Sequence, residues 1–274
     1  TETMRISMNR SLLSRSVLVS VATLTLGAGL LSAQPKPKSQ KEVAVLQKMF
    51  SAPDADAKVA AAEDLLNNYA DSDFKSYALL TEAEVYESKG DYPKTVVFAE
   101  RTLEADPKQY DAMLILARQY ITHVRDNDLD REEKLTKGEK YAKDAVALIQ
   151  TAAKPNPSLT DDQWNTAKKQ ATAEADAALA TAAAARKKYT EAEDLYKQAI
   201  ELSGVPIPSL NVRLAATYNK DGKYDLALAE LDKVKAMPNP GAAVSQVADQ
   251  ERAKAMQGKS GGVAKPATPA VPKP

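Results

Sequence analysis

The sequence contains no cysteine and a single histidine, His123. The absence of cysteine excludes disulfides, thiol catalysis and cysteine-based metal sites. Aromatic residues make up only 5% of the chain, whereas hydrophobic residues make up 44%, and many of these are alanine. Alanine is the strongest helix former and lets helices pack closely. Because few segments alternate apolar and polar residues with a period of two, no sheet is expected, and we predict an all-α protein.

The chain also lacks an excess of either charge, since Lys+Arg and Asp+Glu both number 37. No basic stripe interleaved with aromatic residues is present, so nucleic acid is not expected as a partner. The sequence has no Walker A motif, no Gly-rich strand-to-helix turn and no G-x-S-x-G motif. We therefore expect no cofactor and predict that the chain is not an enzyme.

The N-terminal segment has the pattern of an export signal. Three arginines precede an uncharged, largely apolar run at residues 17–31, and small residues follow it up to Ala33. This pattern predicts a secretory signal peptide over residues 1–33, cleaved after Ala33, and a periplasmic or secreted protein. The run is shorter than the roughly 20 apolar residues of a membrane span. The alternative is an uncleaved signal that anchors the chain in the inner membrane through residues 17–31.

Between its ends the chain shows helical signals that recur with a period of about 34 residues. The clearest unit is 76–109, in which Leu79, Ala83 and Tyr86 fall on one face of a first helix. A Gly-Asp-Tyr-Pro turn follows, with Pro93 suited to the first position of a second helix. Similar positions recur three times downstream. They are held by Met113, Leu116, Ala117 and Tyr120 and by Leu214, Ala215, Tyr218 and Gly222, whereas the third unit matches best in its second helix, at Tyr189, Ala192 and Tyr196.

These residues resemble the tetratricopeptide repeat (TPR) family, whose first helix carries a bulky residue, a Leu-small pair and a tyrosine. The resemblance implies an α-solenoid of antiparallel helix pairs, a TPR-like superhelix with flexible termini, over residues 57–237. Its units are a half-repeat at 57–75, followed by 76–109, 110–155 with an insertion, 160–204 and 208–237. The chain departs from the family in having no tryptophan at the bulky position and an insertion near residues 125–136.

The regions outside the repeats have simpler predicted roles. Residues 34–56 are expected to form a spacer and a degenerate first helix, and residues 238–257 a capping helix. The Pro/Ala/Lys tail, 258–274, has too few large apolar residues to offset its ordering entropy, so we expect it to be disordered.

In the TPR family the first helix of each repeat lines a concave groove that takes an extended peptide or a partner helix. The resemblance therefore implies a non-enzymatic protein- or peptide-binding scaffold or adaptor of the bacterial cell envelope. The alternative is a self-assembling structural envelope protein, that is, a homo-oligomer. The predicted groove residues are Tyr77, Leu80, Glu84, Leu114, Arg118, Ile121, Thr181, Val212, Asn219 and Lys220.

Two other features resemble sites of chemistry. His123 would need a nucleophile or a carboxylate beside it to act in catalysis, and a helix-end histidine is the simpler interpretation. The carboxylates of Asp126, Asp128 and Asp130 alternate as in a calcium loop. An EF-hand loop also needs glycine at its sixth position and glutamate at its twelfth, where this chain has Arg131 and Lys137. We therefore expect no metal site there.

Overall fold

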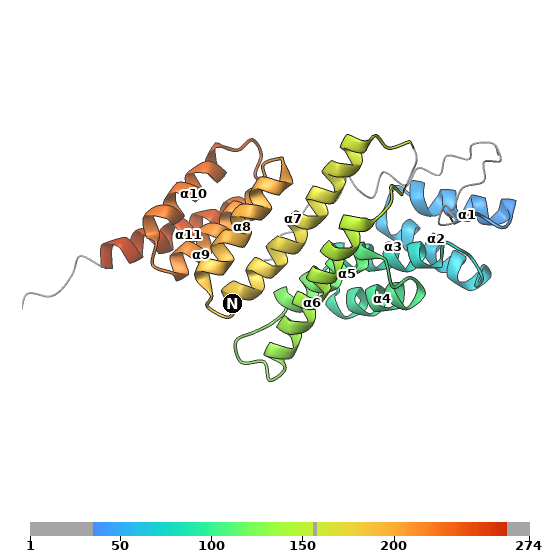
Figure 1. Cartoon of the computed structure of the whole chain (residues 1–274), viewed down its shortest axis with the longest axis horizontal. Coiled ribbons are helices and arrows are strands. Elements are labelled where there is room, and N and C mark those ends of the chain that lie inside the picture. Colours follow the sequence, from blue (N-terminus) through green and yellow to red (C-terminus); the bar gives the residue numbers. More distant parts are fainter. Residues whose placement is uncertain (1–34, 156–157, 262–274) are drawn as a thin grey trace, which may run out of the picture. The chain divides into compact units, whose positions relative to one another are not determined.

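The computed structural model describes residues 35–155 and 158–261, and this part contains eleven α-helices and no strand (Figure 1). The all-α prediction is confirmed. The helices are α1 (Gln40–Ser51), α2 (Ala55–Asn68), α3 (Lys75–Ser88), α4 (Tyr92–Ala105), α5 (Tyr110–Thr122), α6 (Arg131–Thr151), α7 (Asp161–Ala185), α8 (Tyr189–Ser203), α9 (Pro208–Lys220), α10 (Tyr224–Ala236) and α11 (Ala242–Gly261).

The chain forms two compact units, with the boundary between Ala178 and Leu179, inside α7. The signal-peptide prediction for residues 1–33 and most of the predicted tail, residues 262–274, lie outside the described residues. None of the helices in the described part is long and apolar enough to cross a membrane.

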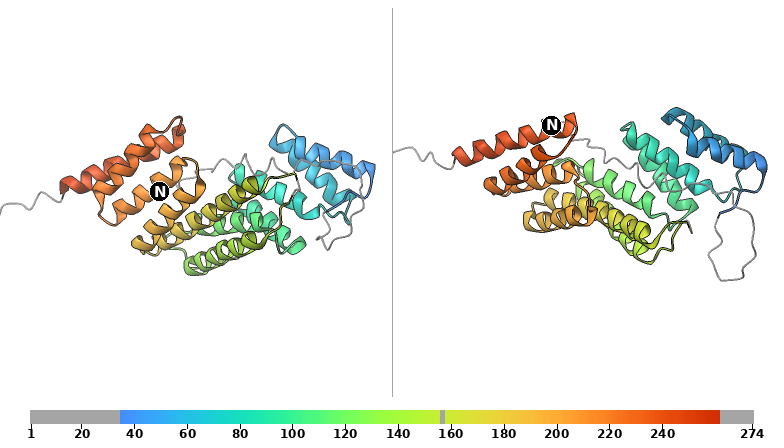
Figure 2. Two further views of the ribbon diagram at one scale, coloured as in Figure 1. Left: turned by 45° about the horizontal axis from the view of Figure 1, so that its top comes forward. Right: turned by 90° about the horizontal axis from the view of Figure 1, so that it is seen from above.

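Within each unit, consecutive helices pack as antiparallel hairpins (Figure 2). In the first unit α1 packs on α2, α3 on α4 and α5 on α6, while in the second α9 packs on α10 and on the final helix α11. The pair α1–α2 has its own apolar core around Leu46, Met49 and Leu65, which joins the next pair through Phe74 and Ala78. Residues 34–56, predicted as a spacer and a degenerate first helix, contain α1, which pairs with α2 of the predicted half-repeat.

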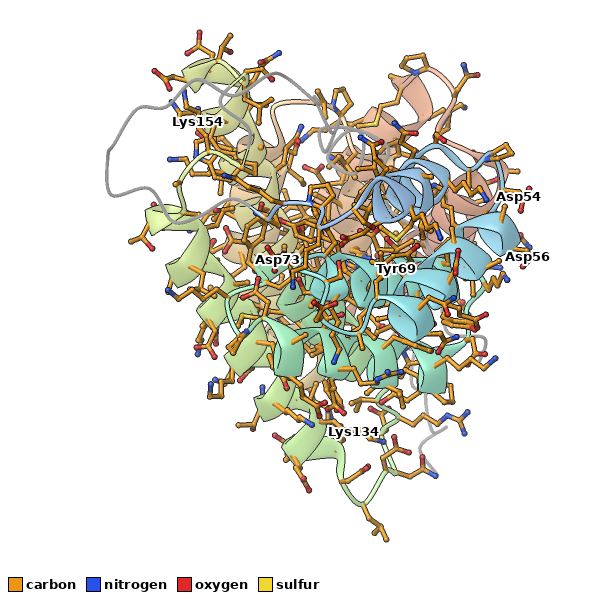
Figure 3. The ribbon with its side chains drawn as sticks, turned by 90° about the vertical axis from the view of Figure 1, so that its right-hand side faces the viewer. Asp54, Asp56, Tyr69, Asp73, Lys134 and Lys154 are labelled. Carbon is orange, nitrogen blue, oxygen red and sulfur yellow. The ribbon has the colours of Figure 1, made fainter. Side chains whose placement is uncertain are left out.

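Helix starts in the first unit are set by short polar side chains. Ser39, Asp54 and Asp91 each cap a helix by accepting a hydrogen bond from a backbone N–H in its first turn. Such a bond satisfies a donor that has no partner within the helix. Figure 3 shows Asp54 and Asp56 at the start of α2. Pro93 lies in the first turn of α4, as predicted from the sequence.

Three hairpin turns share one backbone geometry. The α3–α4, α7–α8 and α9–α10 turns each place a residue at positive φ: Gly90 at 70°, Lys187 at 62° and Gly222 at 75°. In each turn the next residue donates its N–H to a carbonyl five residues earlier, at 2.8–2.9 Å. This bond closes the end of the first helix, and the left-handed residue that permits it is normally glycine. Lys187 adopts the same conformation with a full side chain.

The hairpin α5–α6 differs from the others because its second helix is 21 residues long and starts at Arg131, inside the predicted insertion. The predicted insertion is therefore partly helical. Gly138 allows the close approach of α6 to α5, because an added Cβ would lie 2.6 Å from Cγ1 of Ile121 and 3.0 Å from the carbonyl oxygen of Ala117. At the other end, α11 continues to Gly261, beyond the predicted capping segment, 238–257.

Candidate functional site

In the first unit, the candidate groove residue Arg118 is part of an ion-pair network. Its Nε and Nη2 donate to the two carboxylate oxygens of Glu87 on α3, both at 2.7 Å, and its Nη1 lies 3.4 Å from Oε2 of Glu174 on α7. Gln119 also donates to Glu87, at 2.8 Å. The side chain of Arg118 is only 20% exposed. Arg118 of α5 thus links α3 and α7, and these contacts give Arg118 a role in holding the helices together.

The predicted groove residues divide by burial. Four of them are buried, and these are Leu80, Leu114, Ile121 and Val212. Their side chains belong to the apolar core, because neighbouring helices cover the face that the periodicity assigned to a groove. Tyr77, Glu84, Arg118, Thr181 and Asn219 are partly exposed, and Lys220 is exposed. The structure therefore leaves six of the predicted residues at the surface of the described part of the chain.

Tyr77 packs its ring beside Phe74, with the ring centroids 5.9 Å apart. Burial raises the pKa of the Tyr77 hydroxyl, and the nearby carboxylates of Asp106 and Asp111 add to this effect. The phenol therefore stays neutral and can serve as a hydrogen-bond donor at the edge of α3.

In the second unit, Thr181 links the end of α7 to two other helices. Its hydroxyl lies 2.9 Å from the hydroxyl of Tyr196 on α8 and accepts a hydrogen bond from Arg213 of α9 at 3.2 Å. Arg213 was not among the predicted groove residues. Thr181 therefore has internal partners, like Arg118 in the first unit.

Asn219 and Lys220 lie at the rim of a surface hollow of about 260 Å³ between α9, α10 and α11. The hollow is lined by Ala216, Asn219, Lys220, Tyr224, Glu251 and Lys254. Asn219 donates through Nδ2 to both the backbone oxygen and Oε2 of Glu251, at 2.9 Å each, and Lys254 donates to Oε1 of Glu251 at 2.6 Å. Lys220 and Lys254 bring two cationic side chains to the edge of this hollow.

One side of this hollow was predicted from the sequence and the other was not. Asn219 and Lys220 were predicted from the register of α9, but Lys254 and Glu251 come from α11, which was assigned only a capping role. The available signal was the polar character of α11, and nothing local in the sequence shows that α11 packs on α9 as well as on α10.

Polar side-chain bonds between neighbouring helix pairs recur at separations a little shorter than the repeat period. Arg118 and Glu87 are 31 residues apart, Lys223 and Glu193 are 30 apart, and Asn219 and Glu251 are 32 apart. Hydrogen bonds from Lys223 to Asp221 and to Glu193 raise the pKa of the Lys223 ammonium group. A side chain in one repeat thus reaches the corresponding region of the next.

The two other candidates have structural explanations. His123 stacks on Tyr92, with the ring centroids 4.3 Å apart, and its Nδ1 lies 3.1 Å from the backbone oxygen of Gln119. In the acidic loop, Asp128 and Asp130 pair with Lys134, at 3.7 Å and 3.0 Å. Figure 3 shows Lys134 in the first turns of α6. Among the described residues, no group of three or more histidine, aspartate or glutamate side chains is arranged to hold a metal ion.

Repeated antiparallel helix pairs, a shared hairpin turn and polar bonds between neighbouring pairs define a helical-repeat protein of the TPR fold. A crystal structure of a thermophilic TPR protein from Thermus thermophilus is similar, with a TM-score of 0.51 and 19% sequence identity. The alignment covers 78% of this chain and 96% of that one. No protein-family model and no curated protein matches the sequence. The predicted fold is confirmed by this likeness, which concerns the fold alone.

Proposed function

We propose that this chain is a non-enzymatic scaffold that binds a protein or a peptide, and that the hollow at α9 and α11 is a principal contact. The observation that carries the proposal is the meeting of Asn219 and Lys220 with Lys254 at this hollow. A repeat fold places such side chains on stacked first helices, where an extended segment can lie across several of them. The hollow, of about 260 Å³, has room for one side chain of a partner.

The charges at the hollow indicate the chemistry of that side chain. Glu251 is bonded to Asn219 and Lys254, so its charge is already balanced. Lys220 remains as an exposed cation at the rim. An acidic or otherwise hydrogen-bond-accepting group on the partner is therefore favoured.

We place this activity in the bacterial cell envelope, because residues 1–33 have the pattern of a signal peptide. On this proposal the mature protein starts at Gln34 and is periplasmic or secreted. Mass measurement of the N-terminus of the protein recovered from its host tests this point directly. A chain that retains residues 17–31 in a membrane fraction would instead support the anchored alternative.

The binding proposal is tested by affinity capture of the mature protein, tagged at its C-terminus, from the envelope fraction of its host. We expect one or a few proteins to copurify with the wild type. Lys220→Glu is expected to weaken the binding of the recovered partner about tenfold, that is by about 1.4 kcal/mol. The matched control is Lys233→Glu, which reverses an exposed lysine on α10, away from the hollow.

Two results would contradict this proposal. Equal loss of binding in both charge reversals would show a general charge effect without a role for the hollow. Recovery of the protein alone, as a stable multimer, would favour the self-assembling alternative.

A further inference from the structure

Four glutamate side chains are buried among the described residues, and three of them have hydrogen-bond partners. Glu193 accepts from Lys223 at 2.8 Å and 3.0 Å, and Glu251 accepts from Asn219. The third, Glu42, accepts from the hydroxyl of Ser72 at 2.6 Å.

The fourth, Glu82 on α3, is only 1% exposed, and neither of its carboxylate oxygens has a hydrogen-bond partner. An ionised carboxylate in such a place loses its hydration without compensation.

The position of Glu82 in the repeat explains its burial. The first helices α5 and α9 carry a leucine four residues before their tyrosine, namely Leu116 and Leu214, and both leucines are almost fully buried. In α3 the residue four before Tyr86 is Glu82. The fold therefore directs this side chain into the core, where α3 packs against α2 and α4.

The surrounding charges do not compensate for this burial. Burial raises the pKa of Glu82 to about 7, Glu63 of α2 adds to the rise, and Arg101 of α4 partly opposes it. The charged residues of α5, Asp111 and Arg118, do not contribute to this shift. Glu82 therefore ionises near neutral pH, whereas an ordinary glutamate ionises near pH 4.5.

We propose that Glu82 is a proton-dependent weak point of the first unit, whose ionisation loosens the packing of α3 against α2 and α4. The helices around Glu82 then open more readily in mildly alkaline than in mildly acidic solution. Such opening needs no partner and does not depend on the proposed function.

The sign of the effect follows from the two protonation states. The folded chain keeps the proton on Glu82 up to a pH of about 7, whereas the unfolded chain loses it near the ordinary value of 4.5. The stabilisation is therefore complete below pH 4.5 and is lost as the pH rises through about 7. Between these values the unfolding constant rises about tenfold per pH unit, and on the order of 100-fold between about pH 5 and pH 7.

The test compares the full mature chain with Glu82→Leu, which restores the residue that α5 and α9 carry. Unfolding by urea is measured between about pH 5 and pH 8, and the ratio of the two unfolding constants is taken at each pH. Other titrating groups cancel in this ratio. We expect the ratio of wild type to variant to rise on the order of 100-fold from about pH 5 to pH 7 and then to level off. A ratio constant within about twofold over this range would overturn the proposal.

A second variant and a matched control keep the test independent of how leucine packs. Glu82→Gln removes the charge with nearly the same shape, and the ratio of the wild-type unfolding constant to that of this variant must show the same rise. The control is Glu193→Gln, which neutralises a buried glutamate that already has a lysine partner. It is expected to bring no gain in stability at about pH 8, and a gain equal to that of Glu82→Gln would refute a role specific to Glu82.

Hydrogen exchange tests where the opening occurs. Protection factors for the amides of α2, α3 and α4 in the wild type should fall between about pH 6 and pH 8, relative to those of α9 and α10. In Glu82→Leu this difference between the helices should disappear. Protection that changes equally in all five helices of the wild type would place the weak point elsewhere.

Discussion

Each of the two units contains one energetically unfavourable feature, and the two features lie in different parts of the repeat. The first unit closes its α3–α4 turn with glycine but buries Glu82 without a hydrogen-bond partner. The second unit bonds both of its buried glutamates but closes the α7–α8 turn with Lys187 at positive φ. One defect is electrostatic and lies in the core, while the other is a backbone strain at the surface. Because each helix pair packs mainly on its neighbours, a local defect is tolerated where those neighbours are well packed.

The cores of the two units also differ in the size of their side chains. The first unit buries many large apolar residues, whereas in the second unit the buried apolar residues of α8 and of the end of α7 are alanine, apart from Tyr196. Alanine allows close helix approach but buries little area per residue. Apolar burial therefore offsets more of the free-energy cost of a buried carboxylate in the first unit than it would in the second.

The largest expected effect comes from shortening one core leucine in each unit. Leu116→Ala in the first unit and Leu214→Ala in the second each remove an almost fully buried side chain at equivalent positions. Each is expected to lower the free energy of unfolding by about 2–5 kcal/mol. Trp164, the only tryptophan, lies in the first unit, so its fluorescence should shift with Leu116→Ala more than with Leu214→Ala.

Circular dichroism of the same samples reports both units. The control is Leu226→Ala, which truncates a side chain that is 49% exposed and should change stability by less than about 0.5 kcal/mol. If both probes shift equally in both leucine variants, the two units unfold as one and the comparison between them fails.

A smaller effect is expected from the network of Arg118 in the first unit. Arg118→Met leaves Glu87 and Glu174 without their guanidinium partner, while both carboxylates are largely covered. We expect a loss of about 1–3 kcal/mol, measured by urea unfolding, because two covered carboxylates each lose a charged hydrogen-bond partner.

The matched surface pair joins Lys259 to Asp225, with side chains 58% and 78% exposed. Lys259→Met should cost less than about 0.5 kcal/mol, since solvent screens such pairs. Equal costs for the two variants would show that the ties between repeats contribute no more than surface ion pairs.

The smallest effect concerns the strained turn of the second unit. Lys187→Gly is expected to raise the free energy of unfolding by up to about 1 kcal/mol, because glycine adopts positive φ without steric cost. Gly222→Ala, at the equivalent turn, is expected to lower it by about 1 kcal/mol, since no nearby atom restricts the new methyl group and only the backbone opposes it. Thermal unfolding of both variants checks the pair. Changes of the same sign would contradict a common turn geometry.

Much of the fold was predictable because its signals are local. The spacing of Leu79, Ala83 and Tyr86 marks one face of a helix, and Gly90 with Pro93 marks the turn that follows it. The pair α1–α2 was predicted only as a degenerate first helix and a half-repeat, because its first helix lies in a segment that starts with prolines and lysines. Its apolar residues Val45, Leu46 and Met49 were the available signal.

The candidate site was predictable only in part. The register of α9 gave Asn219 and Lys220, which do line a hollow, but Leu114 and Val212 from the same kind of reasoning are buried. Periodicity assigns a residue to a face of its helix. It does not show how far neighbouring helices extend over that face.

The sequence by itself determined the helical class, the pairing of successive helices and the turn between them, because propensity, period and turn chemistry act within a few residues along the chain. Only the tertiary structure decided which polar side chains find partners. Glu82 and Glu193 are both buried glutamates, yet Lys223 from the next helix pair reaches Glu193, and no donor reaches Glu82. Hydrogen bonding and solvent exposure depend on atoms that are about 30 residues apart in the chain, and these meet only when the repeats stack.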